Sequence, residues 1–405
     1  MTSEQITKAV ILVGGPSRGT RFRPLSFKTP KPLFPVAGRP MIYHHIKALS
    51  QLGIIKEVLI IGFYEPELFN SFIDSAQNEF GIGIRYLREY QSLGTAGGLY
   101  HFRDQILRGS TERFFVMNAD VVCSFPLQEM LDSHIRNYEK PKCTILATTV
   151  EDSDSAHRFG CLVKNEKNQV MHYVEKPESF LSNLISCGVF LFENTIFQQM
   201  KNIKAMKEEK EEAFGLEIDV LRPMAGTGQL YVYEMEHFWN QIKTPGSSVS
   251  ANRMYLQSYM ITCPDLVTKH VESGAEIISP VYIHPSASIH GTAKIGPNVS
   301  IGANAVVGRG VRVAESIILE NVTLKENSCI LNSIVGMDTN VGEWARVEGT
   351  PEPAPNRPLT TNGIKVPSIT ILGGDISVEP EVIIRNCIVL PHKELRNSYH
   401  NEILL

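Results

Sequence analysis

Residues 281–313 read VYIHPSASIHGTAKIGPNVSIGANAVVGRGVRV, and an aliphatic side chain recurs at every sixth position of this stretch. A hexapeptide repeat is typical of a parallel β-helix, in which each six-residue segment forms one flat side and the aliphatic side chain points into a stacked core. Ordinary antiparallel strands are the alternative, and the strict spacing disfavours them. The repeated positions are Ile283, Ile289, Ile295, Ile301, Val307, Val313 and Leu319, with a second set two residues earlier at Val281, Ala287, Ala293, Val299, Ala305 and Val311.

The repeat is interrupted further along the chain. Its register is expected to slip near Lys325 and to resume at Val335, Val341 and Val347. Residues 350–367, TPEPAPNRPLTTNGIKVP, contain five prolines, and proline cannot donate to a β-ladder. We expect an exposed loop there, which is either a tolerated surface insertion or a rigid interaction loop. The repeat pattern returns at SITILGG (368–374) and VIIRNCIVL (382–390).

The first part of the chain has a different pattern, in which short apolar runs alternate with amphipathic stretches. Alternation of this kind predicts an α/β domain, with a mostly parallel sheet and helices on both faces. We therefore expect this domain over 1–250, a helical linker over 251–280 and a β-helix over 281–405. The predicted strands are 9–13, 57–63, 84–87, 113–120 and 143–150, and the clearest predicted helices are 41–53 and 126–138.

Composition excludes several classes of protein. The 405 residues contain 39 Lys and Arg against 43 Asp and Glu, a formal charge of −4, which does not favour binding to nucleic acid or to a membrane surface. No apolar run approaches the length of a membrane span, and the first residues do not have the pattern of a secretory signal. The seven cysteines include no CxxC pair. Reduced thiols in a cytoplasmic protein are the expectation.

A glycine-rich turn follows the first predicted strand. Residues 14–33 read GGPSRGTRFRPLSFKTPKPL. Backbone N–H groups of such a turn can approach a phosphate, and Arg21, Arg23 and Lys31 supply cations that suit several phosphates. The Walker pattern GxxxxGK[ST] and the dinucleotide pattern GxGxxG are both missing from this turn. A purely structural tight turn is the alternative.

Three further motifs point to a ligand site. LGTAGG (93–98) is a second glycine-rich turn that would let a base or sugar approach the backbone. NAD (118–120) places Asp120 after a predicted strand, where open α/β sheets bind ligands, although an Asp in this position can also cap a helix. YVEKP (173–177) places Glu175 and Lys176 at another strand end, with a surface ion pair as the alternative.

The order of these motifs resembles the sugar nucleotidyltransferase family, and the hexapeptide repeat is similar to the left-handed β-helix of that family. The resemblance covers essentially the whole chain. It is strongest to the GDP-mannose pyrophosphorylases (mannose-1-phosphate guanylyltransferases), which join GTP and mannose 1-phosphate with the help of magnesium. It implies a Rossmann-like nucleotidyltransferase domain followed by the β-helix.

Three departures from the active members stand out. The turn is two residues longer than the family form GGxGTRLRPLT, and Pro16 removes one N–H donor. In the family motif W-x-D-I-G an Asp helps to hold magnesium, whereas here Gln241 occupies that position in WNQIK (239–243). A neutral amide is a poor magnesium ligand, but its NH₂ group can donate to a phosphate oxygen. The family's N-A-G is also replaced by Ser186-Cys187-Gly188.

These departures are similar to those of the alpha-type regulatory subunits of this family. The resemblance implies that the chain binds GDP-mannose without turnover and mediates allosteric feedback inhibition of a catalytic beta-type subunit. Glu89 would accept from guanine and Gln241 would donate to the pyrophosphate. The implied GDP-mannose-binding residues are Gly14, Gly15, Glu89, Gly94, Thr95, Asn118, Asp120, Gly160, Glu175, Lys176 and Gln241.

The same resemblance has consequences for catalysis and for partners. It leaves no intact catalytic set, and the degenerate positions are Arg21, Lys31, Asp120 and Lys176. No cofactor would be required, and magnesium at Asp120 would matter only in an active enzyme. The β-helix would support self-association. The proline-rich stretch would be the loop that reaches the partner's active site, through Pro351, Pro353, Pro355, Arg357 and Pro358.

Two alternatives remain open from the sequence. An active guanylyltransferase is the first, because the four cationic and acidic positions are present and one Asp with substrate phosphates can hold magnesium. A β-helix acyltransferase is the second, because His284 and His290 lie on the repeat, although such a histidine is more often a solvated turn residue.

Overall fold

The computed structural model describes residues 7–15, 20–91, 93–136, 141–151, 156–208, 214–351, 359–361 and 364–405. The chain folds into two compact units. Met1–Arg18 and Ile42–Trp239 form the first, called here the sheet unit, and Gly19–Met41 and Asn240–Leu405 form the second, called the β-helix unit. Residues 19–41 therefore group with the β-helix unit rather than with the sheet unit, whereas the predicted α/β domain over 1–250 includes them.

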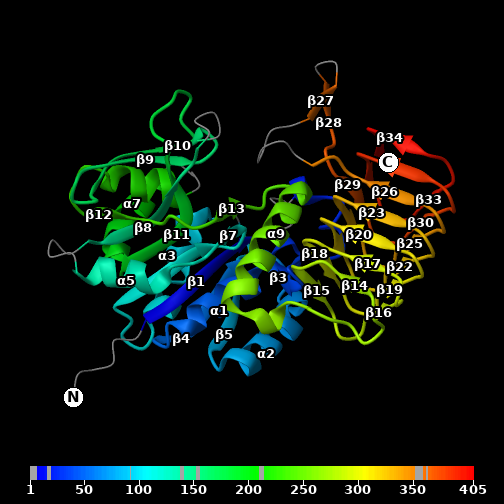
Figure 1. The fold of residues 1–405 in the computed structure, drawn as a ribbon. Helices are drawn as coiled ribbons and strands as arrows, with labels where there is room; N and C mark the ends of the chain where they lie inside the picture. Colours follow the sequence, from blue (N-terminus) through cyan, green and yellow to red (C-terminus); the bar gives the residue numbers. More distant parts are fainter. Residues whose placement is uncertain are drawn as a thin grey trace. The chain divides into compact units, whose positions relative to one another are not determined.

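The sheet unit contains a mixed sheet of nine strands (Figure 1). Its order is β10-β9-β11-β6-β1-β4-β5, with β8 between β11 and β12. The run β6-β1-β4-β5 is parallel, as predicted, whereas β11 is antiparallel to β6, β8 and β9. All five predicted strands occur. The strands are β1 (Thr7–Gly14), β4 (Ile55–Gly62), β5 (Gly83–Arg88), β6 (Arg113–Asn118), β8 (Cys143–Thr149), β9 (Gly160–Lys164), β10 (Val170–Glu175), β11 (Leu184–Glu193) and β12 (Leu230–Glu234).

Helices and a six-residue π-helix accompany the sheet. Both predicted helices are present, as α1 (Met41–Gln51) and α5 (Leu127–Arg136). One core cluster joins apolar side chains of β1, β4, β6 and β8 to Leu99, Phe197 and Leu216, so strands, α3, α7 and the π-helix share one core. The other elements are α2 (Glu67–Phe80), α3 (Thr95–His101), α4 (Arg103–Leu107), α7 (Ile196–Glu208), the π-helix η3 (Leu216–Leu221), α8 (Arg222–Met224) and the short strand β7 (Val121–Cys123). Strand β13 (Trp239–Gln241) begins at the last residue of the sheet unit and continues in the β-helix unit.

The β-helix unit consists of three parallel sheets whose strands stack in successive coils (Figure 1, yellow to red). The first contains β14 (Glu276–Ile277), β17 (Lys294–Ile295), β20 (Arg312–Ala314), β23 (Cys329–Leu331), β26 (Arg346–Glu348), β31 (Ile383–Arg385) and β34 (Tyr399–His400). The second contains β15 (Val281–Ile283), β18 (Val299–Ile301), β21 (Ile317–Ile318), β24 (Ser333–Val335), β29 (Thr370–Leu372), β32 (Ile388–Val389) and β35 (Ile403–Leu404). The third contains β16 (Ser288–Ile289), β19 (Val306–Val307), β22 (Thr323–Leu324), β25 (Asn340–Val341), β30 (Ile376–Val378) and β33 (Lys393–Leu395).

The hexapeptide residues form the core of this unit, as predicted. Ile295, Ile301, Val307 and Val313 are all buried in one cluster. The register slip is earlier than expected, because Ile301 pairs with Ile318 rather than with Leu319. Coils have eighteen residues before this point, and the coils that directly follow it have seventeen. The slip therefore lies between Val313 and Ile318, and the expectation of a slip near Lys325 was wrong.

The proline-rich stretch is inserted between two successive coils. Strand β24 pairs directly with β29, on the far side of the insertion. Within it, β27 (Leu359–Thr361) and β28 (Ile364–Val366) form an antiparallel hairpin outside the β-helix sheets. The expectation of a loop without a ladder is therefore corrected for residues 359–361 and 364–366. Pro351 is exposed, whereas Pro353, Pro355, Arg357 and Pro358 lie outside the described residues.

Residues 19–41 and helix α9 (Pro245–Thr262) both pack on the β-helix coils. Buried Asn252 of α9 accepts hydrogen bonds from the Ala37 N–H (2.8 Å) and the Ser300 hydroxyl (2.8 Å), and donates to the Asn298 carbonyl (3.1 Å). The helix ends at Thr262, so the predicted helical linker 251–280 is helical only in its first part. The other short elements are η1 (Thr20–Phe22), η2 (Lys31–Leu33), β2 (Pro35–Val36), β3 (Arg39–Pro40) and η4 (Pro264–Leu266).

All seven cysteines lie among the described residues as free thiols. Burial raises the pKa of the Cys123 thiol to about 12, and it raises the pKa values of Cys143 and Cys187 well above the usual range. In the part of the chain that the structure describes, no helix is both long enough and apolar enough to cross a membrane.

Candidate functional site

The carboxyl ends of the parallel strands bring three predicted site residues to one edge of the sheet. Beyond the strand ends, Phe63 N–H donates to Gly14 (2.8 Å), Glu89 N–H to Gly62 (2.8 Å) and Ala119 N–H to Leu12 (3.0 Å). These bonds continue the ladder, so Gly14 at the end of β1, Asn118 at the end of β6 and Glu89 just after β5 lie at the same edge of the sheet. Ligands of open α/β sheets bind at this edge.

Glu89 has a defined place at the edge. The residue is only 9% exposed. A Cβ added to Gly98 would lie 2.4 Å from the Glu89 carboxylate oxygen Oε1, closer than any real contact. Gly98, the last glycine of LGTAGG, is therefore required by the present position of the Glu89 carboxylate rather than by a turn of the backbone.

The LGTAGG turn is closely packed against residue Phe214. A Cβ on Gly94 would lie 2.2 Å from the Phe214 carbonyl oxygen, and Gly94 has a φ of 81°. That carbonyl accepts the N–H groups of Ala96 and Gly97, each at 3.1 Å. These are N–H groups of the first turn of α3, which have no partner within the helix. The Phe214 carbonyl caps this helix, so these donors are already used within the protein.

Thr95 connects the same turn to a carboxylate that the sequence reasoning missed. Its hydroxyl accepts from the Leu216 N–H (2.8 Å) and donates to Glu217 Oε2 (3.2 Å). Burial raises the pKa of Glu217, and the nearby Glu175 carboxylate adds to this increase. Glu217 lies on the π-helix, a form often found at functional sites. The motifs gave no signal for it, because no sequence pattern relates it to residue 95.

Glu175 and Lys176 lie at the end of β10, close to this carboxylate. The Glu175 carboxylate accepts from the Tyr173 hydroxyl (3.2 Å) and lies 3.0 Å from Lys176 Nζ. Gly160 lies next to Tyr173 and Glu175. A Cβ on Gly160 would lie 2.3 Å from the Tyr173 hydroxyl and 2.9 Å from Glu175 Oε2. Thr95, Gly160, Glu175 and Glu217 therefore belong to one polar cluster of the sheet unit, which we call the Glu175 cluster.

The replaced N-A-G motif borders the Glu175 cluster. Ser186 Oγ accepts from the Gly188 N–H (3.4 Å) and is hydrogen-bonded to Tyr173, the partner of Glu175. Gly188 has a φ of 74°, and a Cβ there would lie 2.9 Å from Asn118 Nδ2. The substituted segment therefore links the Glu175 cluster to the strand end that carries Asn118.

The other predicted residues are distributed over both units. Gly15 and Asp120 belong to the sheet unit, and Arg21, Lys31 and Gln241 belong to the β-helix unit. A Cβ on Gly15 would lie 2.5 Å from Phe63 Cβ, so this glycine is also fixed by packing. Arg21 is exposed. Gln241 is the last residue of β13, and its backbone N–H donates to the Asn240 side-chain oxygen (2.7 Å).

The donor set does not match the two-carboxylate magnesium site that the family resemblance implies. Asp120 supplies one hard carboxylate, and the second position is the amide of Gln241. Among the described residues, no three His, Cys, Asp or Glu side chains lie close enough together to hold a metal ion.

The two β-helix histidines, His284 and His290, stabilise turns of the backbone. The Nδ1 atom of His284 accepts the Ser286 N–H, and that of His290 accepts the Thr292 N–H, each at 3.2 Å. Both rings also contact the hydroxyl of the same partner, at 2.8 and 3.0 Å. These contacts give each histidine a turn-stabilising role and provide no support for the acyltransferase alternative.

Comparisons with known proteins agree with this architecture. A family model described as nucleotidyl transferase matches residues 8–258, and one described as the GMPPB C-terminal domain matches residues 277–404. The chain is 27% identical to a solved structure from Bacillus anthracis, named as a glucose-1-phosphate thymidylyltransferase in complex with a sucrose. That match has a TM-score of 0.52 and covers 61% of this chain and 94% of the other.

Curated relatives match over the full length. The chain is 53% identical to the mannose-1-phosphate guanylyltransferase regulatory subunit alpha-A of Danio rerio and 50% identical to the regulatory subunit alpha of Rattus norvegicus. Each match covers 98% of this chain and 100% of the relative. The chain therefore belongs to the nucleotidyl transferase family, in the group whose curated members are named mannose-1-phosphate guanylyltransferase regulatory subunit alpha.

Proposed function

We propose that the chain is a non-catalytic subunit that binds GDP-mannose and mediates feedback inhibition of a catalytic mannose-1-phosphate guanylyltransferase. The observation that carries this proposal is the full-length similarity to relatives named regulatory subunits, combined with Gln241 at the position where active members carry an Asp. The similarity supports the regulatory role, and the substitution supports the loss of turnover.

The strand edge supplies the proposed nucleotide contacts. Glu89 accepts from the N1–H and N2–H₂ groups of guanine, because a carboxylate offers two acceptor oxygens to two parallel donors. Its near-complete burial excludes water, which strengthens these bonds. Asn118 ends β6 and Asp120 follows it at the same edge, and we assign both to the sugar and phosphates.

The Glu175 cluster supplies the proposed sugar contacts. Glu175 and Glu217 accept hydrogen bonds from mannose hydroxyls, and Lys176 balances their charge. A pair of nearby carboxylates suits a neutral ligand rich in hydroxyl donors better than it suits a second phosphate. This assignment separates the base contacts at Glu89 from the hexose contacts at Glu175.

Loss of turnover follows from the donor chemistry at position 241. Active members would neutralise the phosphates with magnesium, whereas an amide gives a single neutral hydrogen bond to a phosphate oxygen. Such a bond stabilises a bound product but contributes little to stabilising the extra charge that develops in the transition state. Allosteric control then requires that GDP-mannose binds two states of the assembly with different affinity.

The test is feedback inhibition in a reconstituted assembly. A catalytic subunit is assayed with and without this chain while GDP-mannose is increased. The proposal predicts stronger inhibition when the chain is present, and Glu89→Gln removes this added inhibition. Glu57→Gln serves as the control, because Glu57 is a partly buried carboxylate near the start of β4, paired with Lys8 (2.8 Å). Equal inhibition with and without the chain would refute the regulatory role.

An active guanylyltransferase remains the alternative, because Arg21, Lys31, Asp120 and Lys176 are all present. In that case Gln241→Asp should change little. If this substitution alone creates activity in an otherwise inactive chain, the alternative is wrong and the degenerate-site proposal is supported.

A further inference from the structure

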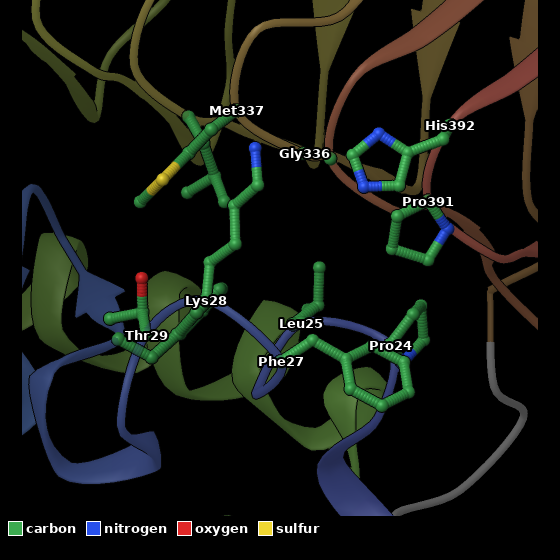
Figure 2. Close-up of a pocket in the computed structure, with 12 residues that line it drawn as sticks. Pro24, Leu25, Phe27, Lys28, Thr29, Gly336, Met337, Pro391 and His392 are labelled. Carbon is green, nitrogen blue, oxygen red and sulfur yellow. The ribbon is translucent and has the colours of Figure 1, made fainter.

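The charged groups that line the pocket between segment 24–34 and the β-helix coils are already paired (Figure 2). Lys28 Nζ lies 3.4 Å from Asp338 Oδ2, and His392 Nδ1 lies 2.7 Å from Asp375 Oδ2. The rest of the lining is mostly apolar. A buried histidine of the sheet unit has a more direct relation to the proposed site.

This histidine is His45, which lies on α1 and is completely buried. Its Nε2 atom lies 3.1 Å from the carbonyl oxygen of Asn118, the last residue of β6. A carbonyl oxygen can only accept a hydrogen bond, so this contact places the ring hydrogen on Nε2. The imidazole of His45 is therefore a donor to the backbone at the edge of the sheet where we place the ligand.

His45 supplies a hydrogen bond that the sheet does not. The ladder between β6 and β11 ends one residue before the Asn118 carbonyl. The N–H of the same peptide group belongs to Ala119, and it donates to the Leu12 carbonyl of β1 at 3.0 Å. Both polar ends of this peptide group are therefore held, one by the sheet and one by His45. Because the peptide group directly precedes Asp120, its orientation decides where the Asp120 carboxylate can point.

The same ring also holds the far end of the turn that follows β6. It packs against the buried ring of Phe125, with the two ring centroids 4.7 Å apart. Phe125 has a φ of 49°, a conformation that is unusual for a bulky residue and persists only where surrounding contacts impose it. His45 therefore contacts segment 118–125 at both of its ends, and Asp120 lies between these two contacts.

We propose that His45 is a positioning residue of the GDP-mannose site, which acts through the backbone of segment 118–125. Its Nε2–H donor fixes the peptide group before Asp120 and thereby sets the direction of the Asn118 and Asp120 side chains. This inference rests on the proposed function, in which both side chains contact the sugar and phosphates. The sequence motifs gave no signal for His45, because it lies on a predicted helix outside them.

Two substitutions separate the hydrogen bond of His45 from the packing of its ring. His45→Phe keeps an aromatic ring against Phe125 but removes the donor, whereas His45→Gln removes the ring and keeps an N–H donor. GDP-mannose affinity is measured by calorimetric titration of the full chain. We expect His45→Phe to weaken binding at least about tenfold, and His45→Gln to stay within about threefold of the wild type. A histidine that served packing alone would give the opposite order.

His134→Phe is the matched control, because His134 is another buried histidine of the sheet unit. Its ring nitrogens lie 2.7 Å from Thr144 Oγ1 and 3.1 Å from Glu193 Oε1. Glu193 pairs with Arg113 at the opposite end of β6, so this histidine is remote from the strand edge. His134→Phe should lower the melting temperature and leave GDP-mannose affinity unchanged. An equal loss of affinity in both His→Phe variants would contradict a specific role of His45.

Hydrogen exchange tests the same role without a ligand. Backbone amides of residues 119–123 in the free chain should exchange at least about tenfold faster in His45→Phe than in the wild type, His45→Gln or His134→Phe. Unchanged exchange in His45→Phe would overturn the proposal, as would unchanged GDP-mannose affinity. If the wild type does not bind GDP-mannose, the proposed function fails, and the exchange rates still decide whether His45 holds the turn.

Discussion

At the scale of single residues, the absence of a side chain at Gly98 leaves the space that the Glu89 carboxylate occupies. The Glu89 carboxylate occupies the space where a Cβ of residue 98 would be, 2.4 Å away. Because a carboxylate is the far end of a flexible side chain, it can move when that space is filled. The fold then tolerates the change, whereas the proposed guanine contact does not.

Gly98→Ala is therefore expected to weaken GDP-mannose binding at least tenfold without unfolding the chain. Alanine in the interior of α3 even favours the helix by about 1 kcal/mol, so the melting temperature should not fall. Calorimetric titration and a thermal melt provide the two measurements. Gly83→Ala is the control, because its nearest neighbour would be 3.5 Å away. Unchanged affinity in Gly98→Ala would remove Glu89 from the proposed base site.

Glu193 provides a prediction about acid stability. Burial alone would raise its pKa, but hydrogen bonds from His134 (3.1 Å) and Arg113 (2.6 Å) outweigh burial and lower it below the usual 4.5. The unfolded chain then binds more protons than the folded chain, so this stabilisation is complete above about pH 4.5 and is lost as the pH falls through the lower folded value.

Thermal melts of wild type and Glu193→Gln from pH 7 to pH 3 check this prediction. The variant should be less stable at pH 7, and the difference should shrink below about pH 4.5, where wild-type Glu193 also becomes protonated. A difference that stays constant over the whole range would contradict the role assigned to Glu193.

The motifs predicted the position of some residues of the proposed site and could not predict others. Glu89 follows β5 and Asn118 ends β6, so sequence pattern and strand topology together place them at one edge of the sheet. Thr95 was expected at a ligand, but its hydroxyl hydrogen is directed at Glu217. Glu217 itself lies far along the chain, and only the folded structure brings its carboxylate to Thr95.

At the scale of elements, helix α3 is capped by a carbonyl from a distant segment. Phe214 accepts two of its first N–H groups, and Gly94 makes the approach possible. The glycines of LGTAGG predicted a close approach of something to this backbone. The sequence pattern cannot distinguish a ligand from another stretch of the same chain, because both need the same empty space.

Gly94→Ala and Gly53→Ala separate these effects. Both glycines have positive φ, 81° and 68°, but a Cβ on Gly53 would meet nothing within 4 Å. Gly53→Ala should cost about 1–2 kcal/mol, the conformational penalty alone. Gly94→Ala should cost clearly more, because the Cβ overlaps the Phe214 carbonyl and because a ψ of 168° places Gly94 in a backbone region essentially restricted to glycine. Chemical denaturation measures both, and equal losses would show that the Phe214 contact contributes nothing.

The β-helix was the element most fully predicted. Its inward residues repeat in sequence as they stack in space, and the cluster from Ile295 to Val313 is found as expected. The register slip was misplaced because Ile318 and Leu319 are both aliphatic. A pattern based on residue type alone cannot show which of two adjacent aliphatic residues points inward, whereas strand pairing can.

At the scale of the whole molecule, the β-helix unit is built from two separate stretches of the chain. Residues 19–41 leave the sheet unit early and pack with α9 on the coils. Asn252 connects all three parts through hydrogen bonds to Ala37, Asn298 and Ser300. Sequence pattern could not predict this arrangement, because it depends on one buried amide and on contacts that span about half the chain.

Asn252→Ala should therefore destabilise the β-helix unit by about 2–4 kcal/mol, since it leaves buried donors and an acceptor without partners. Gln257→Ala is the control, because Gln257 is an exposed amide side chain on the same helix. Denaturation curves of the two variants provide the comparison. A loss for Asn252→Ala no greater than that for Gln257→Ala would show that the amide does not hold the three parts together.

The most direct test of the central claim is pyrophosphate release by the purified chain alone, supplied with GTP, mannose 1-phosphate and magnesium. The account predicts no saturable turnover from a folded sample that still binds GDP-mannose in a parallel titration. Saturable turnover that Asp120→Ala abolishes would contradict it and would make the chain an active guanylyltransferase.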